Sequence, residues 1–161
     1  MTVYKFPERG SGSPNPEALS RVGMLLDVDV QVVAPLEALM RRRGERVESF
    51  RGLAIVDTGA SMTSVHSSII AGFDLIPMNK VFVDTLRGRS LIDTYAVRLA
   101  FPSLDGWEVE RVEVLSGQHA LSVIMGRDIL RHCRLDWDGS AGQWSLDIPA
   151  TNIRIESPPE W

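Results

Sequence analysis

Cysteine is nearly absent from this sequence of 161 residues: Cys133 is the only one, so no disulfide can form within the chain. This excludes the disulfide-stapled class of small secreted domains and fits a reducing compartment. Long hydrophobic runs are missing as well, because no stretch is long enough to cross a bilayer and the first residues lack the apolar core of a signal peptide. We therefore expect a cytoplasmic protein that does not enter a membrane.

Positive charge is not in excess. The formal net charge is −4, which argues against nucleic acid as a partner, since a phosphate backbone is normally met by a basic surface. The cationic cluster at residues 41–46 is interleaved with glutamates and lacks aromatic neighbours, so we interpret it as part of a solvated helix or hairpin excursion. The three histidines show no metal-ligand spacing, so neither a metal nor a cofactor is expected.

Apolar residues make up 44% of the chain and charged residues 24%, a balance that fits one globular domain with a core. Residues 8–17 (ERGSGSPNPE) offer almost nothing to bury. We therefore expect a flexible tail over residues 1–20, followed by a single domain over residues 21–161.

Short runs that alternate apolar and polar residues dominate this domain, as in half-buried strands. The candidate strands lie within residues 21–33, 48–56, 80–101, 107–115, 121–126 and 134–149. The run at 80–101 turns at Gly88 and is typical of a long hairpin, and a closing hairpin would pair Trp137 with Trp144. The helical pieces are too brief to form a layer, so the sequence predicts an all-β, closed, barrel-like domain with one or two short helices.

Asp27 and Asp29 lie on the first of these runs as Asp-x-Asp. Phosphatases of the haloacid dehalogenase type also place Asp-x-Asp after an apolar strand, but their motif has Thr or Val where this sequence has Gln31. We therefore interpret the two aspartates as the solvated face of a strand.

The segment AIVDTGAS, residues 54–61, leads from an apolar strand into an acid, a hydroxyl and a glycine. Thr58 can bond backbone groups, and Gly59 lets the backbone approach closely or adopt a positive φ. Asp57 at such a turn is desolvated, and burial raises the pKa of an aspartate. Where two carboxylates share a site, one stays ionised while the other keeps its proton, so the pair can activate a water molecule. The sequence offers one acid in such a setting.

Residues 57–61 (DTGAS) resemble the active-site motif of the retropepsin-like aspartic proteases, in which apolar strand residues also precede the acid. The second landmark of that family, two apolar residues followed by glycine, is matched by residues 124–126 (IMG). The continuation at 127–128 (RD) is similar to that of the retroviral enzymes. Gly126 follows Asp57 by 69 residues, close to the separation within a retropepsin monomer, and the resemblance covers roughly residues 22–149.

This resemblance implies a single-lobe acid protease. Pepsin-like enzymes carry two Asp-Thr/Ser-Gly motifs in one polypeptide, and this chain carries one, so the implied active form is a homodimer. It would be an endopeptidase acting on a peptide or protein substrate, over which a hairpin called the flap closes. The implied site residues are Asp57 as the catalytic acid; Thr58, Gly59 and Ala60 as its support; Gly59, Leu86, Arg87, Gly88, Arg89, Ile124 and Met125 as substrate contacts; and Gly126, Arg127 and Asp128 as the structural motif.

Several alternatives stay open at this point. Ser61 stands where retroviral members often carry an acid that meets the arginine, so Arg127 must pair near Asp128 or with a backbone carbonyl. Arg87 and Arg89 would either favour acidic peptides or serve solubility. The alternative to an enzyme is a non-catalytic peptide-binding or dimerisation module with the same fold. The acidic turn of actin-like ATPases and sugar kinases does not fit, because those enzymes need two large α/β domains.

Overall fold

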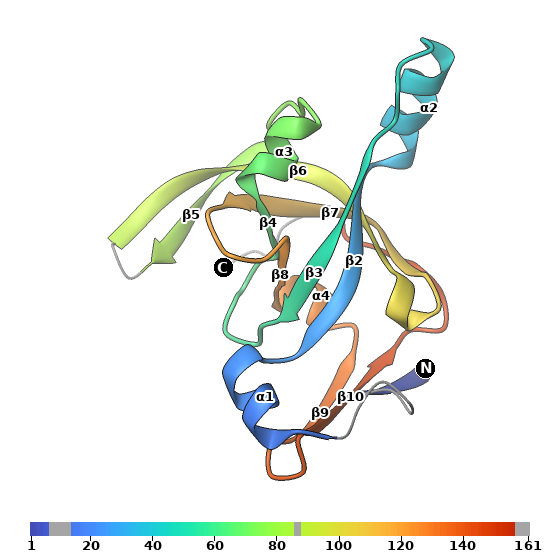
Figure 1. Ribbon diagram of the computed structural model, residues 1–161. Coiled ribbons are helices and arrows are strands. Elements are labelled where there is room, and N and C mark those ends of the chain that lie inside the picture. Colours follow the sequence, from blue (N-terminus) through green and yellow to red (C-terminus); the bar gives the residue numbers. More distant parts are fainter. Residues whose placement is uncertain (7–13, 86–87, 157–161) are drawn as a thin grey trace.

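The computed structural model describes residues 1–6, 14–85 and 88–156 (Figure 1). Its strands are β1 (Thr2–Phe6), β2 (Leu25–Val32), β3 (Ser49–Val56), β4 (Ser64–His66), β5 (Asn79–Thr85), β6 (Gly88–Phe101), β7 (Trp107–Gly117), β8 (Val123–Met125), β9 (Arg134–Asp138), β10 (Gln143–Ile148) and β11 (Ile153–Arg154). Its helices are α1 (Pro16–Val22), α2 (Ala34–Arg42), α3 (Ser67–Gly72) and α4 (Arg127–Leu130), with a 3-10 turn, η1, over Pro102–Leu104. Far more residues lie in strands than in helices, so the predicted all-β class is confirmed.

Six of the strands close into a barrel. Backbone pairing joins β11, β7, β4, β8, β3, β2, β6 and β5 in that order, and an additional pairing of β7 with β6 completes a ring. β5 and β11 attach outside this ring. Figure 1 shows β5 extending away from it beside β6. Closure gives each ring strand two neighbours, which removes the exposed edges that an open sheet would have. The predicted barrel-like architecture is confirmed.

The barrel interior is filled by alternate residues of the ring strands, because successive side chains point to opposite faces of a strand. On β2, the four alternating apolar residues are each at most 1% exposed. The first three of them, Leu26, Val28 and Val30, belong to one core cluster with inward-facing residues of β3, β6, β7 and β8, including Ala54, Val97, Leu99, Val112 and Met125. The alternation that predicts a half-buried strand within residues 21–33 therefore matches the face of β2 that is buried.

The other face of β2 meets solvent. Asp27 is exposed, and the Asp29 carboxylate accepts two hydrogen bonds from the Arg51 guanidinium, both at 2.8 Å. These bonds lower the pKa of Asp29. The interpretation of the two aspartates as a solvated strand face is confirmed.

β5 and β6 form the long hairpin that the sequence predicts. Its register runs from Asn79 opposite Thr94 to Thr85 opposite Gly88. The predicted contact residues Leu86 and Arg87 lie outside the described residues. Residues 88–93 of β6 pair with β5 alone, so an arm of two strands extends away from the barrel (Figure 1).

The expected flexible tail over residues 1–20 needs correction, because it contains β1 and part of α1. β1 pairs with β10 in a second sheet, ordered β1-β10-β9, where Phe6 stacks on Trp144 at 4.2 Å between ring centroids. α1 begins at Asn15, whose side chain caps the helix through the N–H groups of Glu17 and Ala18. Trp144 also lies opposite Trp137, as the sequence predicts.

The expected number of helices is also wrong: the described residues contain four short α-helices rather than one or two. α1 begins in the supposed tail, and α2 ends within the cationic cluster at residues 41–46. In α2, Glu37 and Arg41 form an ion pair one turn apart at 2.7 Å, and the arginines that follow are exposed. The cationic cluster is therefore the solvated end of a helix.

Candidate active site

The two predicted landmarks meet on adjacent strands. β3 ends at Val56, directly before Asp57, and β8 ends at Met125, directly before Gly126. The strands run parallel, with Val56 opposite Met125, and the Asp57 N–H donates to the Met125 carbonyl at 3.0 Å. Residues far apart in the sequence thus leave the barrel side by side, and the loop after β3 lies against the start of α4.

Asp57 begins a tight turn that orients its own carboxylate. Its Oδ1 accepts a hydrogen bond from the Gly59 N–H at 2.8 Å, and its carbonyl accepts one from the Ala60 N–H at 3.3 Å. Gly59 does not use the left-handed region, but a Cβ there would lie 3.1 Å from Asp57 Oδ1. Glycine therefore serves close approach rather than positive φ. Asp57 is half-buried, while Thr58 and Gly59 are exposed.

Arg127 binds backbone carbonyls, which decides between the two partners that the sequence left open. Its Nη1 donates to the carbonyls of Thr58, at 2.8 Å, and Gly59, at 3.3 Å. Its own N–H donates to the Ala60 carbonyl at 2.9 Å. Position 61 is a serine and offers no carboxylate, so Arg127 binds the loop itself. Its hydrogen bonds reach the carbonyls of the three residues that follow Asp57.

Gly126 allows the loop to pack directly on the strand end. A Cβ on Gly126 would lie 2.5 Å from the backbone carbon of Met62, closer than side chains approach, so only glycine fits. The Gly126 N–H donates to the hydroxyl of Thr63 at 3.1 Å. Sequence analysis did not identify Thr63, because its role depends on contacts with residues more than 60 positions away.

Asp128 is a structural acid at the start of α4. It is 3% exposed, and its carboxylate accepts hydrogen bonds from the Thr63 hydroxyl at 2.7 Å and from the N–H groups of Thr63 and Ile129, both at 2.9 Å. Burial raises the pKa of Asp128, and these hydrogen bonds oppose the rise. Asp128 therefore fixes the loop between β3 and β4 (residues 57–63, the Asp57 loop) to α4 from the buried side. Arg127 binds the same loop from the exposed side.

Ile124 and Met125 point to opposite faces of β8. Met125 is fully buried in the barrel core, so its side chain is not accessible to a substrate, whereas Ile124 is half-buried on the other face. Of the two expected contacts, Ile124 alone has a side chain that a ligand can reach in this structure. Opposite Ile124 lies Ser64, whose hydroxyl is 3.2 Å from Nε2 of His119.

His119 joins the loop before β8 to β4. Its Nδ1 lies 2.6 Å from the Leu121 carbonyl, so this nitrogen donates, and its Nε2 lies 3.2 Å from the Ser64 hydroxyl. Burial lowers the pKa of His119, with a smaller contribution from His66 nearby. These contacts fit the structural role expected for this histidine.

The expected substrate contacts on the β5–β6 hairpin are described only in part. Gly88 opens β6 with a φ of 106°, and the Arg89 guanidinium lies 4.5 Å from the centroid of the Phe82 ring. Phe82 and Leu91 lie opposite each other and are 61% and 53% exposed. By alternation they share the strand face that continues into the barrel core through Tyr95 and Val97.

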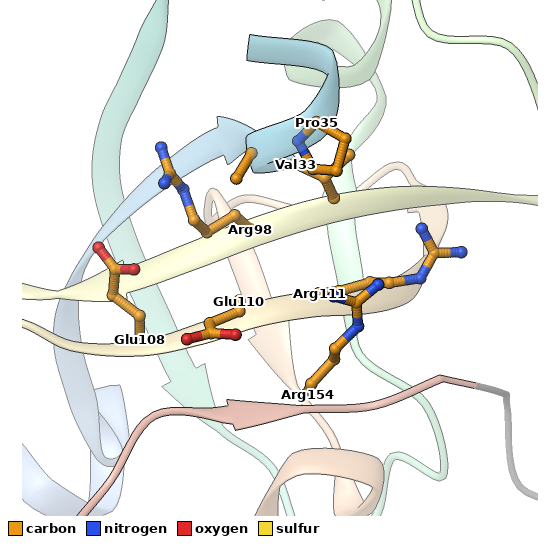
Figure 2. Close-up of a pocket in the computed structure, with 8 residues that line it drawn as sticks. Val33, Pro35, Arg98, Glu108, Glu110, Arg111 and Arg154 are labelled. Carbon is orange, nitrogen blue, oxygen red and sulfur yellow. The ribbon is translucent and has the colours of Figure 1, made fainter. Parts of the chain in front are cut away.

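A charged cavity of about 240 Å³ lies away from this site, where α2 and β11 meet β6 and β7 (Figure 2). Its lining is Val33, Ala34, Pro35, Arg98, Glu108, Glu110, Arg111 and Arg154. Arg98 donates to Glu37 at 2.6 Å, and both Arg111 and Arg154 form ion pairs with Glu156. These pairs join α2 and the C-terminal strand to the barrel, so we interpret the cavity as a packing seam rather than as part of the Asp57 site.

Two structural checks apply to the part of the chain that the structure describes. It contains no group of three or more His, Cys, Asp or Glu side chains that could hold a metal ion. Within the same residues, no helix is both long and apolar enough to span a bilayer. Burial raises the pKa of the Cys133 thiol to about 11, so the thiol stays protonated at neutral pH and suits a packing role.

The chain resembles known proteins in structure but not in sequence. No protein-family model matches the chain. No curated protein sequence matches it either. Among solved structures, the chain is similar to the solution structure of the simian foamy virus (mac) protease, with 16% sequence identity, coverage of 67% of this chain and 92% of that chain, and a TM-score of 0.43. Since the sequence identity and the TM-score are both low, the interpretation of the site depends on the geometry of the Asp57 loop.

Proposed function

We propose that this chain is one subunit of an aspartic endopeptidase in which two Asp57 carboxylates meet across a homodimer axis. The observation that carries the proposal is the Asp57 loop: a carboxylate at the end of a barrel strand, oriented by the Gly59 N–H and presented beside exposed backbone. Arg127 and Asp128 position this loop from both sides. Hydrogen bonds thus fix both the carboxylate of Asp57 and the loop that carries it. Such an arrangement around one half-buried acid favours a chemical role for Asp57 over a role as the first residue of an ordinary turn.

The chemistry requires a second carboxylate. Within the described residues, the Asp57 carboxylate accepts a hydrogen bond from the Gly59 N–H and is paired with no second carboxylate, so the proposal takes the partner acid from another copy of the chain. With two copies, the ionised Asp57 takes a proton from water, whose oxygen attacks the peptide carbonyl carbon. The protonated Asp57 gives its proton to the carbonyl oxygen, which produces a tetrahedral gem-diol. When the C–N bond then breaks, the Asp57 that took the proton of the water gives it to the leaving nitrogen, and the other Asp57 regains a proton from a hydroxyl of the gem-diol as the carboxylic acid product forms.

The substrate would be an extended peptide between the Asp57 loop and the β5–β6 hairpin. Extended peptides bind largely through main-chain hydrogen bonds, and side-chain pockets add preference. Ile124 on β8 and the exposed pair Phe82 and Leu91 offer apolar contacts, so apolar substrate residues are favoured. Arg89 is already stacked on Phe82, which fits a role in the hairpin itself.

The test is cleavage of a peptide library by the wild type and by Asp57→Asn. The variant keeps the shape of the side chain and the acceptor for the Gly59 N–H but removes the ionisable group, so we expect cleavage to fall by about a thousandfold or more. Asp27→Asn, a change of the same kind at an exposed position, should cleave like the wild type.

Two outcomes would oppose the proposal. Equal cleavage by Asp57→Asn would exclude Asp57 as the catalytic acid. A dimeric wild type that binds library peptides without cleaving any of them would instead support the non-catalytic peptide-binding or dimerisation module.

A further inference from the structure

The arm of the β5–β6 hairpin leaves the barrel at one residue pair. Thr94 is the last residue of β6 that pairs with β5, opposite Asn79, and the first that pairs with β7, opposite Leu115. The Met78 N–H also donates to the Thr94 carbonyl at 2.8 Å. Beyond this pair, the arm (residues 79–85 and 88–93) has backbone pairing only between its own two strands. Its direction relative to the barrel is therefore set near Asn79 and Thr94.

A buried carboxylate lies at this point. Glu113 on β7 is 5% exposed, and both of its carboxylate oxygens are 3.1 Å from the side-chain nitrogen of Asn79. The hydroxyl of Thr94, which is fully buried, donates to Glu113 Oε2 at 3.0 Å. Glu113 thus binds one residue from each strand of the arm at the position where the arm begins.

The register explains why the carboxylate can reach both strands. Glu113 lies opposite Ala96 on β6, two residues from Thr94 and therefore on the same face. Alanine leaves room above the sheet, so the longer glutamate side chain extends past it toward Thr94 and Asn79. A carboxylate buried in this way is costly unless it is hydrogen-bonded, and here the hairpin supplies the donors.

We propose that Glu113 is a positioning residue for the β5–β6 arm: its hydrogen bonds to Asn79 and Thr94 set the orientation in which the arm lies over a bound peptide. The part of this inference that concerns peptide rests on the proposed function, whereas the part that concerns the arm does not. If the bonds are removed, the arm samples more orientations, and a smaller fraction of the protein is ready to bind substrate.

The first test is amide hydrogen exchange of the arm in the full-length protein without substrate. Asn79→Ala removes the donor from an exposed position, so it is not expected to disturb folding, and Glu113→Leu removes the carboxylate but keeps an apolar side chain of similar size. In both variants we expect exchange of residues 80–84 and 89–93 to accelerate about tenfold, while β2 and β3 exchange as in the wild type.

Two further variants serve as controls. Lys80→Ala removes the ion pair with Asp93, at 2.9 Å, on the opposite face of the same part of the arm, and should leave arm exchange within about twofold of the wild type. Glu113→Gln keeps an acceptor for Asn79, and its amide can donate to the Thr94 hydroxyl, so this variant should restore wild-type exchange. Arm exchange that is unchanged in Asn79→Ala, or that accelerates equally in Lys80→Ala, would overturn the proposal.

Peptide cleavage gives a second readout. A less oriented arm should raise KM for a library peptide about tenfold in Asn79→Ala with kcat nearly unchanged, since only the fraction of binding-competent protein falls. A fall in kcat with an unchanged KM would contradict the positioning role. A wild type without cleavage would instead refute the proposed function, and arm exchange alone would then decide the role of Glu113.

Discussion

Thr63 is a small residue whose hydroxyl and N–H together make three hydrogen bonds. Its hydroxyl donates to Asp128 at 2.7 Å and accepts from the Gly126 N–H at 3.1 Å, and its own N–H donates to Asp128 at 2.9 Å. It therefore connects the Asp57 loop, the end of β8 and α4 through one side chain and one amide. All of these groups are buried, so the loss of one partner leaves another polar group without hydrogen bonds.

Thr63→Val should lower the free energy of unfolding by about 3 kcal/mol at pH 7, measured by chemical denaturation. The change keeps the shape of the side chain but leaves the Gly126 N–H without its acceptor and removes one donor from Asp128. Thr151→Val, at an exposed loop position, should change stability by less than about 0.5 kcal/mol. Equal losses in the two variants would contradict the account of Thr63.

The same variant has an expected pH dependence. Burial already raises the pKa of Asp128, so its contribution to stability is fully present below the ordinary pKa of an aspartate and is lost as the pH rises through the folded-state pKa. Removal of the Thr63 hydroxyl raises that folded-state pKa further. The stability deficit of Thr63→Val should therefore be larger at pH 7 than at pH 4, and a deficit independent of pH would contradict it.

At the scale of elements, β1 is attached to the barrel by a side-chain contact as well as by its sheet. The Tyr4 hydroxyl donates to Asp105, which follows the η1 turn, at 2.7 Å. The hydrogen bond to this carboxylate, with smaller contributions from burial and the negative charge, raises the pKa of Tyr4 to about 12. The N-terminal strand thus contacts the barrel at a second position besides β10.

Tyr4→Phe should lower the free energy of unfolding by about 0.5 to 1 kcal/mol at pH 7, since one exposed hydrogen bond is lost. Because the folded-state pKa of Tyr4 is raised, its stabilising contribution is complete below pH 10 and is lost as the pH rises toward 12. Denaturation curves of the wild type and the variant should therefore converge over this range. Tyr95→Phe, at the chain's other tyrosine, should not converge with the wild type in this way.

The elements that the sequence predicted are those with a local signal. Alternation identified the ring strands and the β5–β6 hairpin, and the pair Trp137 and Trp144 marked the closing hairpin. Asn15, Pro16 and Gly23 are ordinary signals for the ends of a helix, but they adjoin residues 8–17, whose composition predicts a tail instead of α1. β1 could not be predicted in this way, since its partner, β10, lies more than 130 residues away in the chain.

For the candidate site, motifs predicted the positions but not the contacts. The DTG and IMG segments indicated where the chain turns, and the structure brings them together on β3 and β8. The partner of Arg127, and the roles of Thr63 and Glu113, depend on residues brought together only by the barrel. A hydroxyl, a carboxylate or a guanidinium group has many possible partners in a sequence, so no local pattern predicts which contacts these three side chains make.

At the scale of the whole molecule, each chain of the proposed homodimer is half of an active site. One Asp57 lies half-buried on a loop beside exposed backbone, and its support from Arg127 and Asp128 is complete within the chain. In the proposed homodimer, the second acid is the Asp57 of a second copy of the chain, related to the first by symmetry. Activity should therefore depend on pairs of wild-type chains rather than on single chains.

A mixing experiment tests this claim most directly. A fixed amount of wild-type protein is incubated with increasing amounts of Asp57→Asn until subunits have exchanged, and peptide cleavage is then measured. Because a mixed dimer has one carboxylate, activity should fall in proportion to the wild-type fraction, to about half when the two proteins are present in equal amounts. Activity that stays constant as the variant is added, although mixed dimers are shown to form, would contradict an active site shared by two Asp57 residues.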